Sequence, residues 1–320
     1  MNIASISRRL LALPALATVM VASSPHATAK LRIVTTTPAI ASIASTIGGK
    51  YVSVQALKRG KQDVHHVRPK PSFIIKMRKA DIFIQSGLDG EPWVPGLLRT
   101  SRNERLLVGQ PGNVDVSRGI HLLEVPARGT LSRAQGDIHV FGNPHYLIDP
   151  MNGIIVAGTI ANALNRADPS HASEFDANLA KFTHDVKALS DRLDAKMAPY
   201  ADQPIVVYHR SWPYFRARYH LVKIGEVEPK PGISPGPGHI TKLVAKMKAQ
   251  GAKVVIFEQY NPKNVANRVA SRAGGVAVQL STDVKGIKGA DDYLSYIETN
   301  VNRLVEAFEK AGVATQAKGD

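Results

Sequence analysis

The sequence predicts an α/β protein made of two similar α/β lobes joined by one long rigid helix. Two observations support this prediction. Short apolar runs alternate with segments of helical period, and the second half of the chain repeats the plan of the first. A long amphipathic stripe separates the two halves. With 320 residues, the chain is long enough for two domains of roughly 100–200 residues each.

Residues 1–29 have the layout of a secretory signal peptide. Arg8 and Arg9 precede the apolar run LLALPALATVMVA, and Ala27-Thr28-Ala29 forms an A-x-A cleavage pattern. The apolar run is too short to cross a bilayer as a helix. Because SRRLL also half-resembles a twin-arginine signal, both export routes stay open. We expect the chain to be exported to the periplasm.

The composition excludes several kinds of site and partner. The chain has no cysteine, so a lipid anchor on cysteine, a thiolate metal site and a cysteine nucleophile are all excluded. Without the two signal arginines, 39 basic residues face 26 acidic ones, which is a net charge of +13. The basic residues are scattered and no nucleic-acid-binding motif accompanies them. We therefore expect a solvated basic surface, no nucleic-acid partner and only weak attraction to anionic lipid.

The first lobe is expected over residues 30–168. Its apolar runs predict strands at 31–37, 51–57, 81–87 and, as a short one, 106–109. Helices are predicted at 38–49, closed by two glycines, and at 71–80, which opens with a proline. The segment NPHYLIDP is predicted to form a defined loop ahead of a further helix.

The second lobe is expected over residues 199–320 and follows the same plan. Strands are predicted at 203–209, 220–227, 253–259 and 276–282. Helices are predicted at 241–252, at 262–275 with a glycine signal at its C-terminus, and at 291–310.

Residues 169–198 are expected to form the linking helix. Its apolar positions step by three or four residues: Phe175, Leu179, Phe182, Val186, Leu189, Leu193 and Met197. Asp168-Pro169 supplies a start signal, and the span from Ser170 to Met197 corresponds to about 42 Å of helix at 1.5 Å per residue. The stripe is interpreted as the buried face of a stiff connection between the lobes.

Four positions stand out as candidate metal ligands. His209 and Asp283 each follow an apolar run, at the carboxyl end of a predicted strand, where open α/β sheets place ligand sites. His145 lies in the NPHYLIDP loop, and one histidine of the pair His65-His66 completes the set. Three imidazoles and one carboxylate suit a tetrahedral cation site. His171, His184, His220 and His239 are interpreted as having no role in this site.

Several segments resemble the zinc/manganese family of ABC-transporter periplasmic solute-binding proteins, also called cluster A-I or bacterial solute-binding protein family 9. DVHHVRPKPS (63–72) is similar to the family's D-P-H-x-aromatic-x-P-x-P-S pattern. SGLDGEPW (86–93), NPHYLIDP (143–150), YHRSWPYFRARYHL (208–221) and VIFEQYNPKNVANRVASRAGGV (255–276) resemble further family segments. The resemblance covers nearly the whole mature chain.

The resemblance implies a metal site in the cleft between the lobes. It identifies His65, His145, His209 and Asp283 as the ligands and leaves His66 facing outward, as an acceptor of incoming metal. Val67 and Leu147 depart from the family pattern, and its long histidine-rich loop is reduced here to His121 and His139. His139 is an auxiliary ligand or, as we favour, a surface histidine. Glu258 is interpreted as supporting a ligand without touching the metal itself, as a competing ligand, or as a partner in a salt bridge.

The implied function is capture of a divalent metal and its delivery to a membrane ABC permease driven by a cytoplasmic ATPase. Three imidazoles and one carboxylate favour zinc over magnesium or calcium, and manganese is the alternative ion. A zinc-dependent hydrolase is the rival from the enzyme class. It would need an open coordination position and a general base, so we expect a binding protein and not an enzyme. A surface adhesion module is the third class considered. We also expect a monomer, with a periplasmic metallochaperone as a further partner.

Overall fold

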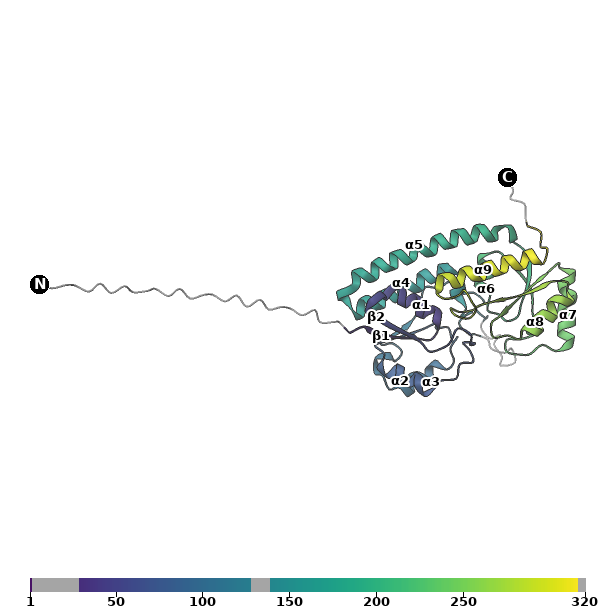
Figure 1. The fold of residues 1–320 in the computed structure, drawn as a ribbon. Coiled ribbons are helices and arrows are strands. Elements are labelled where there is room, and N and C mark those ends of the chain that lie inside the picture. Colours follow the sequence, from purple (N-terminus) through teal and green to yellow (C-terminus); the bar gives the residue numbers. More distant parts are fainter. Residues whose placement is uncertain (2–28, 128–138, 316–320) are drawn as a thin grey trace.

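The computed structural model describes residue 1, residues 29–127 and residues 139–315. The predicted signal peptide lies outside the described residues except for its two ends, Met1 and Ala29. Figure 1 shows two lobes side by side, with the helix α5 running along both of them. Within the described ranges, no helix is both long and apolar enough to cross a membrane.

The first lobe is a parallel four-stranded sheet with the strand order β2-β1-β3-β4. Its elements are β1 (Leu31–Thr35), α1 (Pro38–Gly48), β2 (Val52–Ala56), α2 (Pro71–Lys79), β3 (Ile82–Gln85), α3 (Val94–Ser101) and β4 (Asn113–Asp115). Helix α1 begins where the sequence predicts, because Thr37 caps it by accepting a hydrogen bond from the Ile40 amide and Pro38 occupies its first turn.

The second lobe has the same topology, with the parallel order β6-β5-β7-β8. Its elements are β5 (Pro204–Val207), α6 (Pro213–Arg218), β6 (Val222–Glu226), α7 (Pro237–Ala249), β7 (Val254–Glu258), α8 (Lys263–Arg272), β8 (Val276–Leu280) and α9 (Tyr293–Lys310). Helix α9 starts at a capping box formed by Asp292 and Ser295. The two similar α/β lobes of the prediction are therefore confirmed.

The long linking helix is also confirmed. Helix α5 spans Ala172–Met197, follows a short 3-10 turn (Pro169–His171), and packs against α4 (Pro150–Ala167). It contacts α1 of the first lobe and α9 of the second. Of its predicted stripe, Leu179 is half-buried and the other positions are buried: Phe175, Phe182, Val186, Leu189, Leu193 and Met197. One continuous apolar core runs through this helix from β1 to α9.

The predicted short strand at 106–109 is wrong. Residues Glu104–Leu106 form a 3-10 turn, and the edge strand is β4, a few residues later. Leu106 is buried, but Val108 is 81% exposed, so this apolar run has no buried face along which a strand could pair. The short helices α3 and α6 were not predicted either, because their few apolar positions give too little helical period.

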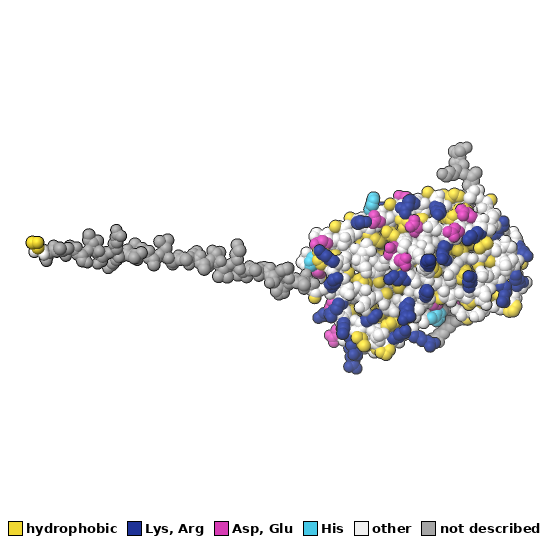
Figure 2. Space-filling view, viewed as in Figure 1, with side chains coloured by type: hydrophobic (Ala, Val, Ile, Leu, Met, Phe, Trp, Pro, Cys, Tyr) yellow, Lys and Arg dark blue, Asp and Glu magenta, His cyan; other side chains and the backbone are white. Residues whose placement is uncertain are grey.

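The lobes touch directly where the loop after β2 meets the loop after β8. Gly60 packs so closely against the backbone of the second lobe that an added Cβ would lie 2.2 Å from the carbonyl oxygen of Val284. The Gln259 side chain donates a hydrogen bond to the Gly60 carbonyl at 2.9 Å. Lys and Arg side chains are dispersed over the face seen in Figure 2 and are interspersed with acidic ones.

Candidate metal site

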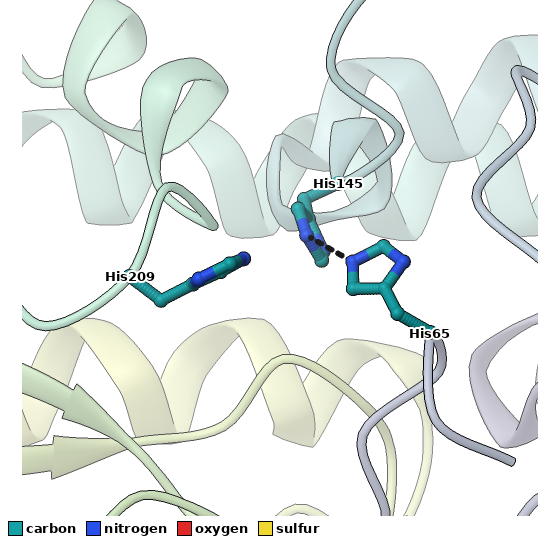
Figure 3. Close-up of side chains that lie close together, drawn as sticks. All are labelled: His65, His145 and His209. Carbon is teal, nitrogen blue, oxygen red and sulfur yellow. Dashed lines mark hydrogen bonds between the residues drawn. The ribbon is translucent and has the colours of Figure 1, made fainter. Parts of the chain in front are cut away.

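Three histidines from both lobes converge at the junction between the lobes. Their ring nitrogens include one set that lies within 4.8 Å of one another, from His65, His145 and His209. His65 lies in the loop between β2 and α2, His145 precedes the turn that leads into α4, and His209 follows β5. In Figure 3, His65 and His209 approach from opposite sides, with His145 between them.

His65 is held with one nitrogen toward the site. Its Nδ1 lies 2.9 Å from the Gly90 carbonyl oxygen, which can only accept, so Nδ1 carries the proton and Nε2 presents its lone pair. Nε2 faces Nε2 of His145 at 3.3 Å. The His65 backbone amide donates to Asp63, which ties the loop into a turn. Burial lowers the pKa of His65 to about 4, so the ring is neutral near pH 7.

His145 is positioned by the asparagine two residues before it. The side-chain oxygen of Asn143 accepts a hydrogen bond from the His145 backbone amide at 3.0 Å. The Asn143 side-chain amide donates to the carbonyl of Arg210 at 2.7 Å, so this loop is fastened to the second lobe next to His209. Burial, followed by the neighbouring rings of His65 and His209, holds the pKa of His145 well below its usual value. His145 is therefore also neutral.

The ring of His209 is oriented by a carboxylate, whereas the ring of His65 is oriented by a backbone carbonyl. Its Nδ1 lies 2.8 Å from a carboxylate oxygen of Glu228, so Nδ1–H donates and Nε2 is left for the site. Burial alone would lower the pKa of His209, but the hydrogen bond to Glu228 and the negative charges of Glu258 and Glu228 outweigh it and raise this pKa. Of the three rings, that of His209 is therefore the most readily protonated.

The arrangement matches what a tetrahedral zinc ion requires of two of its ligands. Two nitrogens bound to zinc at about 2.0–2.1 Å lie about 3.3–3.4 Å apart. The Nε2 atoms of His65 and His145 are 3.3 Å apart. His209 stands up to 4.8 Å from the other two, so a small approach of the second lobe would complete three corners of the tetrahedron.

Asp283 is not part of this group. One of its oxygens accepts from Lys58 Nζ at 2.7 Å, and the other accepts from the backbone amides of Ala39 and Val284 at 2.7 and 2.8 Å. Neither oxygen belongs to the set of ligand atoms that lie within 4.8 Å of one another. Its role as a fourth ligand stays a prediction that this ion pair opposes.

The other histidines and the acid named from the sequence take three different positions. His66 pairs with Asp63 at 2.9 Å and its side chain is 63% exposed. His139 lies against the site, with its ring centroid 4.7 Å from that of His65. Glu258 is fully buried behind His209; its Oε1 accepts from the Trp212 indole at 2.7 Å, and burial raises its pKa to about 7.

Sequence reasoning missed two residues that orient or neighbour the site, Glu228 and Lys58. Glu228 could have been found, because it follows β6 just as His209 follows β5. Neighbouring parallel strands end at the same edge of a sheet, so the order of the strands would have placed these two side chains together. Lys58 gave no such signal, since it lies in the basic run LKRGK, which reads as exposed.

Two curated relatives of this chain are named for zinc uptake or zinc binding. The chain is 31% identical over 169 residues to the "High-affinity zinc uptake system protein ZnuA" of Brucella suis biovar 1, covering 52% of this chain and 50% of that protein. It is 26% identical over 294 residues to the "Zinc-binding protein AdcA" of Streptococcus pyogenes serotype M3, covering 88% of this chain and 57% of that protein. The chain thus spans about half the length of the curated relatives it matches.

Solved structures of this fold superpose over most of the chain. A crystal structure of ZnuA matches with a TM-score of 0.73 at 24% identity, covering 87% of this chain and 99% of the other. The Mn²⁺ complex of FpvC from Pseudomonas aeruginosa matches with a TM-score of 0.71 at 23% identity, covering 88% and 100%. At these identities the likeness shows the shared fold.

The family profile described as "Zinc-uptake complex component A periplasmic" matches residues 33–307, which include all three converging histidines and both lobes. The chain belongs to this family, the ZnuA family of periplasmic zinc-uptake components.

Proposed function

We propose that this chain captures Zn(II) in the periplasm and delivers it to a membrane ABC permease driven by a cytoplasmic ATPase. The observation that carries the proposal is the convergence of three imidazoles from two lobes, two of them at the spacing of zinc ligands. Membership of a zinc-uptake family and the names of its curated relatives support the same function. In this role the chain is a binding protein and not an enzyme.

The ligand set favours zinc among divalent ions. Imidazole nitrogens suit zinc, whereas magnesium and calcium require oxygen ligands, and manganese also prefers carboxylates. Two of the three rings are held neutral, as coordination requires. Hydrogen bonds from Nδ1 to Gly90 and Glu228 fix the rings of His65 and His209 before any metal arrives.

We propose His65, His145 and His209 as the metal ligands. His139 is the side chain we propose as the auxiliary ligand, because its ring lies beside that of His65. His66 is proposed to have no part in the bound complex, since it points to solvent and pairs with Asp63. Glu258 is proposed to support His209 by charge from behind, and not to coordinate.

Metal analysis tests the function directly. The protein is expressed with its signal peptide, purified in its exported form without added metal, and analysed for bound elements. It is then stripped and titrated with zinc and with manganese by calorimetry. We expect zinc to co-purify and to bind with nanomolar affinity, and to displace manganese. Co-purified manganese that zinc cannot displace would contradict the proposal.

The cleavage site of the signal peptide, the location of the protein and its oligomeric state are also proposals. We propose cleavage after Ala29, which the A-x-A pattern supports, and a periplasmic location, which the family supports. We also propose that the protein is a monomer. The mass of the exported protein measures the cleavage site, and light scattering measures the oligomeric state. A retained N-terminal segment would contradict the export proposal.

A further inference from the structure

A buried ion pair joins the two lobes beside the candidate metal site. Lys58 comes two residues after β2 in the first lobe, and Asp283 comes three residues after β8 in the second. The Lys58 ammonium lies 2.7 Å from the Asp283 carboxylate, and the two side chains are only 2% and 4% exposed. Gly60 lies against Val284 immediately next to the pair, so the two loops are packed backbone to backbone. This close packing of the two loops keeps the Lys58 side chain beside Asp283.

Both oxygens of the Asp283 carboxylate already have partners in this arrangement. Besides the Lys58 contact on Oδ2, its Oδ1 accepts hydrogen bonds from the amides of Ala39 and Val284. To reach a metal, Asp283 would have to leave Lys58 without its counter-charge inside the protein. An unpaired buried charge is strongly unfavourable, so the pair opposes that movement.

The ion pair is close enough to matter to the histidines. Lys58, Asp283 and His145 line the same small cavity, of about 40 Å³, between the lobes. The positive charge of Lys58 is one of the influences on the His145 ring. Asp283 therefore lines the same cavity as His145, and its carboxylate is paired with the lysine there.

We propose that Lys58 withholds the Asp283 carboxylate from the metal and so biases the site toward zinc and against manganese. The inference rests on the proposed zinc-binding function. With Asp283 neutralised, a captured ion meets imidazoles and no carboxylate from this strand end. Zinc accepts such a set, whereas manganese, which prefers oxygen donors, loses more by the missing carboxylate. Lys58 acts as a specificity-determining residue that touches no metal.

The decisive variant removes both charges together. Lys58→Met/Asp283→Asn contains no unpaired buried charge, so it is expected to fold. Its zinc dissociation constant, measured by calorimetry on the full protein, should stay within about threefold of the unchanged protein, because Asp283 is not a ligand. A loss of roughly a hundredfold or more would mean that Asp283 coordinates zinc, and would overturn the inference.

The single variant tests selectivity. Lys58→Met frees the carboxylate, and the ratio of the manganese to the zinc dissociation constant should fall by roughly tenfold as manganese gains an oxygen ligand. Lys58→Arg keeps the positive charge and is the matched control, with an unchanged ratio. An unchanged ratio in Lys58→Met would also overturn the inference. If Lys58→Met does not fold, the double variant still decides whether Asp283 coordinates zinc, and coordination would overturn the inference.

The two proposals fail in different ways. If the unchanged protein binds no zinc, the proposed function is wrong. If it binds zinc but the double variant does not, the function stands and only the role of Lys58 is wrong.

Discussion

The two lobes share one strand order, but they shift the pKa values of their histidines in opposite directions. In the first lobe, Nδ1 of His65 donates to a neutral backbone carbonyl, and burial lowers the pKa of the ring to about 4. In the second lobe, Nδ1 of His209 donates to the carboxylate of Glu228, and the pKa of the ring is raised. The same topology thus holds two histidines with lowered pKa values in the first lobe and one histidine with a raised pKa in the second.

This difference assigns separate tasks to the lobes. His65 and His145 stand 3.3 Å apart, neutral and ready to bind, so they form the preset half of the site. His209 lies farther away, and because its pKa is raised, a proton competes with the metal for its Nε2 more than for the other two rings. Metal capture by the first lobe, followed by attachment of His209 from the second, is the order of events that this asymmetry predicts.

The largest expected effect comes from removing the preset half. His65→Ala and His145→Ala should each weaken zinc binding by more than roughly 100-fold, beyond the 10–100-fold typical of losing an outer partner. His209→Ala should cost less, because the pair in the first lobe remains. Competition with a chromogenic chelator measures all three.

His184→Ala is the matched control for these variants, because His184 is an exposed histidine on α5. Its zinc affinity should equal that of the unchanged protein. An unchanged affinity in His65→Ala or His145→Ala would remove the preset pair from the site. A greater loss in His209→Ala than in both others would reverse the assignment of tasks.

The next effect is on pH dependence. Because the pKa of His209 is raised, a proton competes with zinc on this ring, and affinity should fall by up to about tenfold per pH unit below that pKa. Glu228→Gln removes the main cause of the raised pKa, so burial should then lower it and move the loss of affinity to lower pH. At pH 8 the variant should bind up to roughly 10-fold more weakly, since the neutral amide oxygen of Gln is a weaker acceptor for the ring than the carboxylate.

Glu226→Gln provides the control for total charge, because Glu226 pairs with Arg210 and Lys223 and not with His209. Calorimetry between pH 8 and pH 6 compares the three proteins. Superimposable pH profiles for Glu228→Gln and the unchanged protein would show that His209 is not the proton-sensitive ligand.

The smallest effect separates the two accessory histidines of the first lobe. His139 lies beside His65, so His139→Ala should weaken zinc binding by roughly tenfold at most, or slow its uptake, as expected for an outer partner. His66 faces solvent, so His66→Ala should leave equilibrium binding unchanged. Stopped-flow uptake and calorimetry measure the two quantities. Equal effects of the two substitutions would remove His139 from the site.

Much of the fold could be read from local patterns. The apolar stripe of α5 was predicted because the helical period can be recognised within one short segment of sequence. All of its residues except Leu179 are buried. The strands of both lobes were predicted as apolar runs, except for β4, which is short and of mixed character. The convergence of His65, His145 and His209 followed from the family resemblance and from their places after strands and in a proline-bounded loop, and not from spacing alone.

The sequence by itself determined the two-lobe α/β plan, the long connecting helix and the types of side chain offered at strand ends, because these depend on periodicity and residue chemistry within short segments. Only the tertiary structure decided that Asp283 pairs with Lys58, that Glu228 supports His209 and that His139 lies beside His65. Lys58 and Asp283 are 225 residues apart. Their pairing is created by the packing of one lobe against the other, and no local pattern in either segment carries that information.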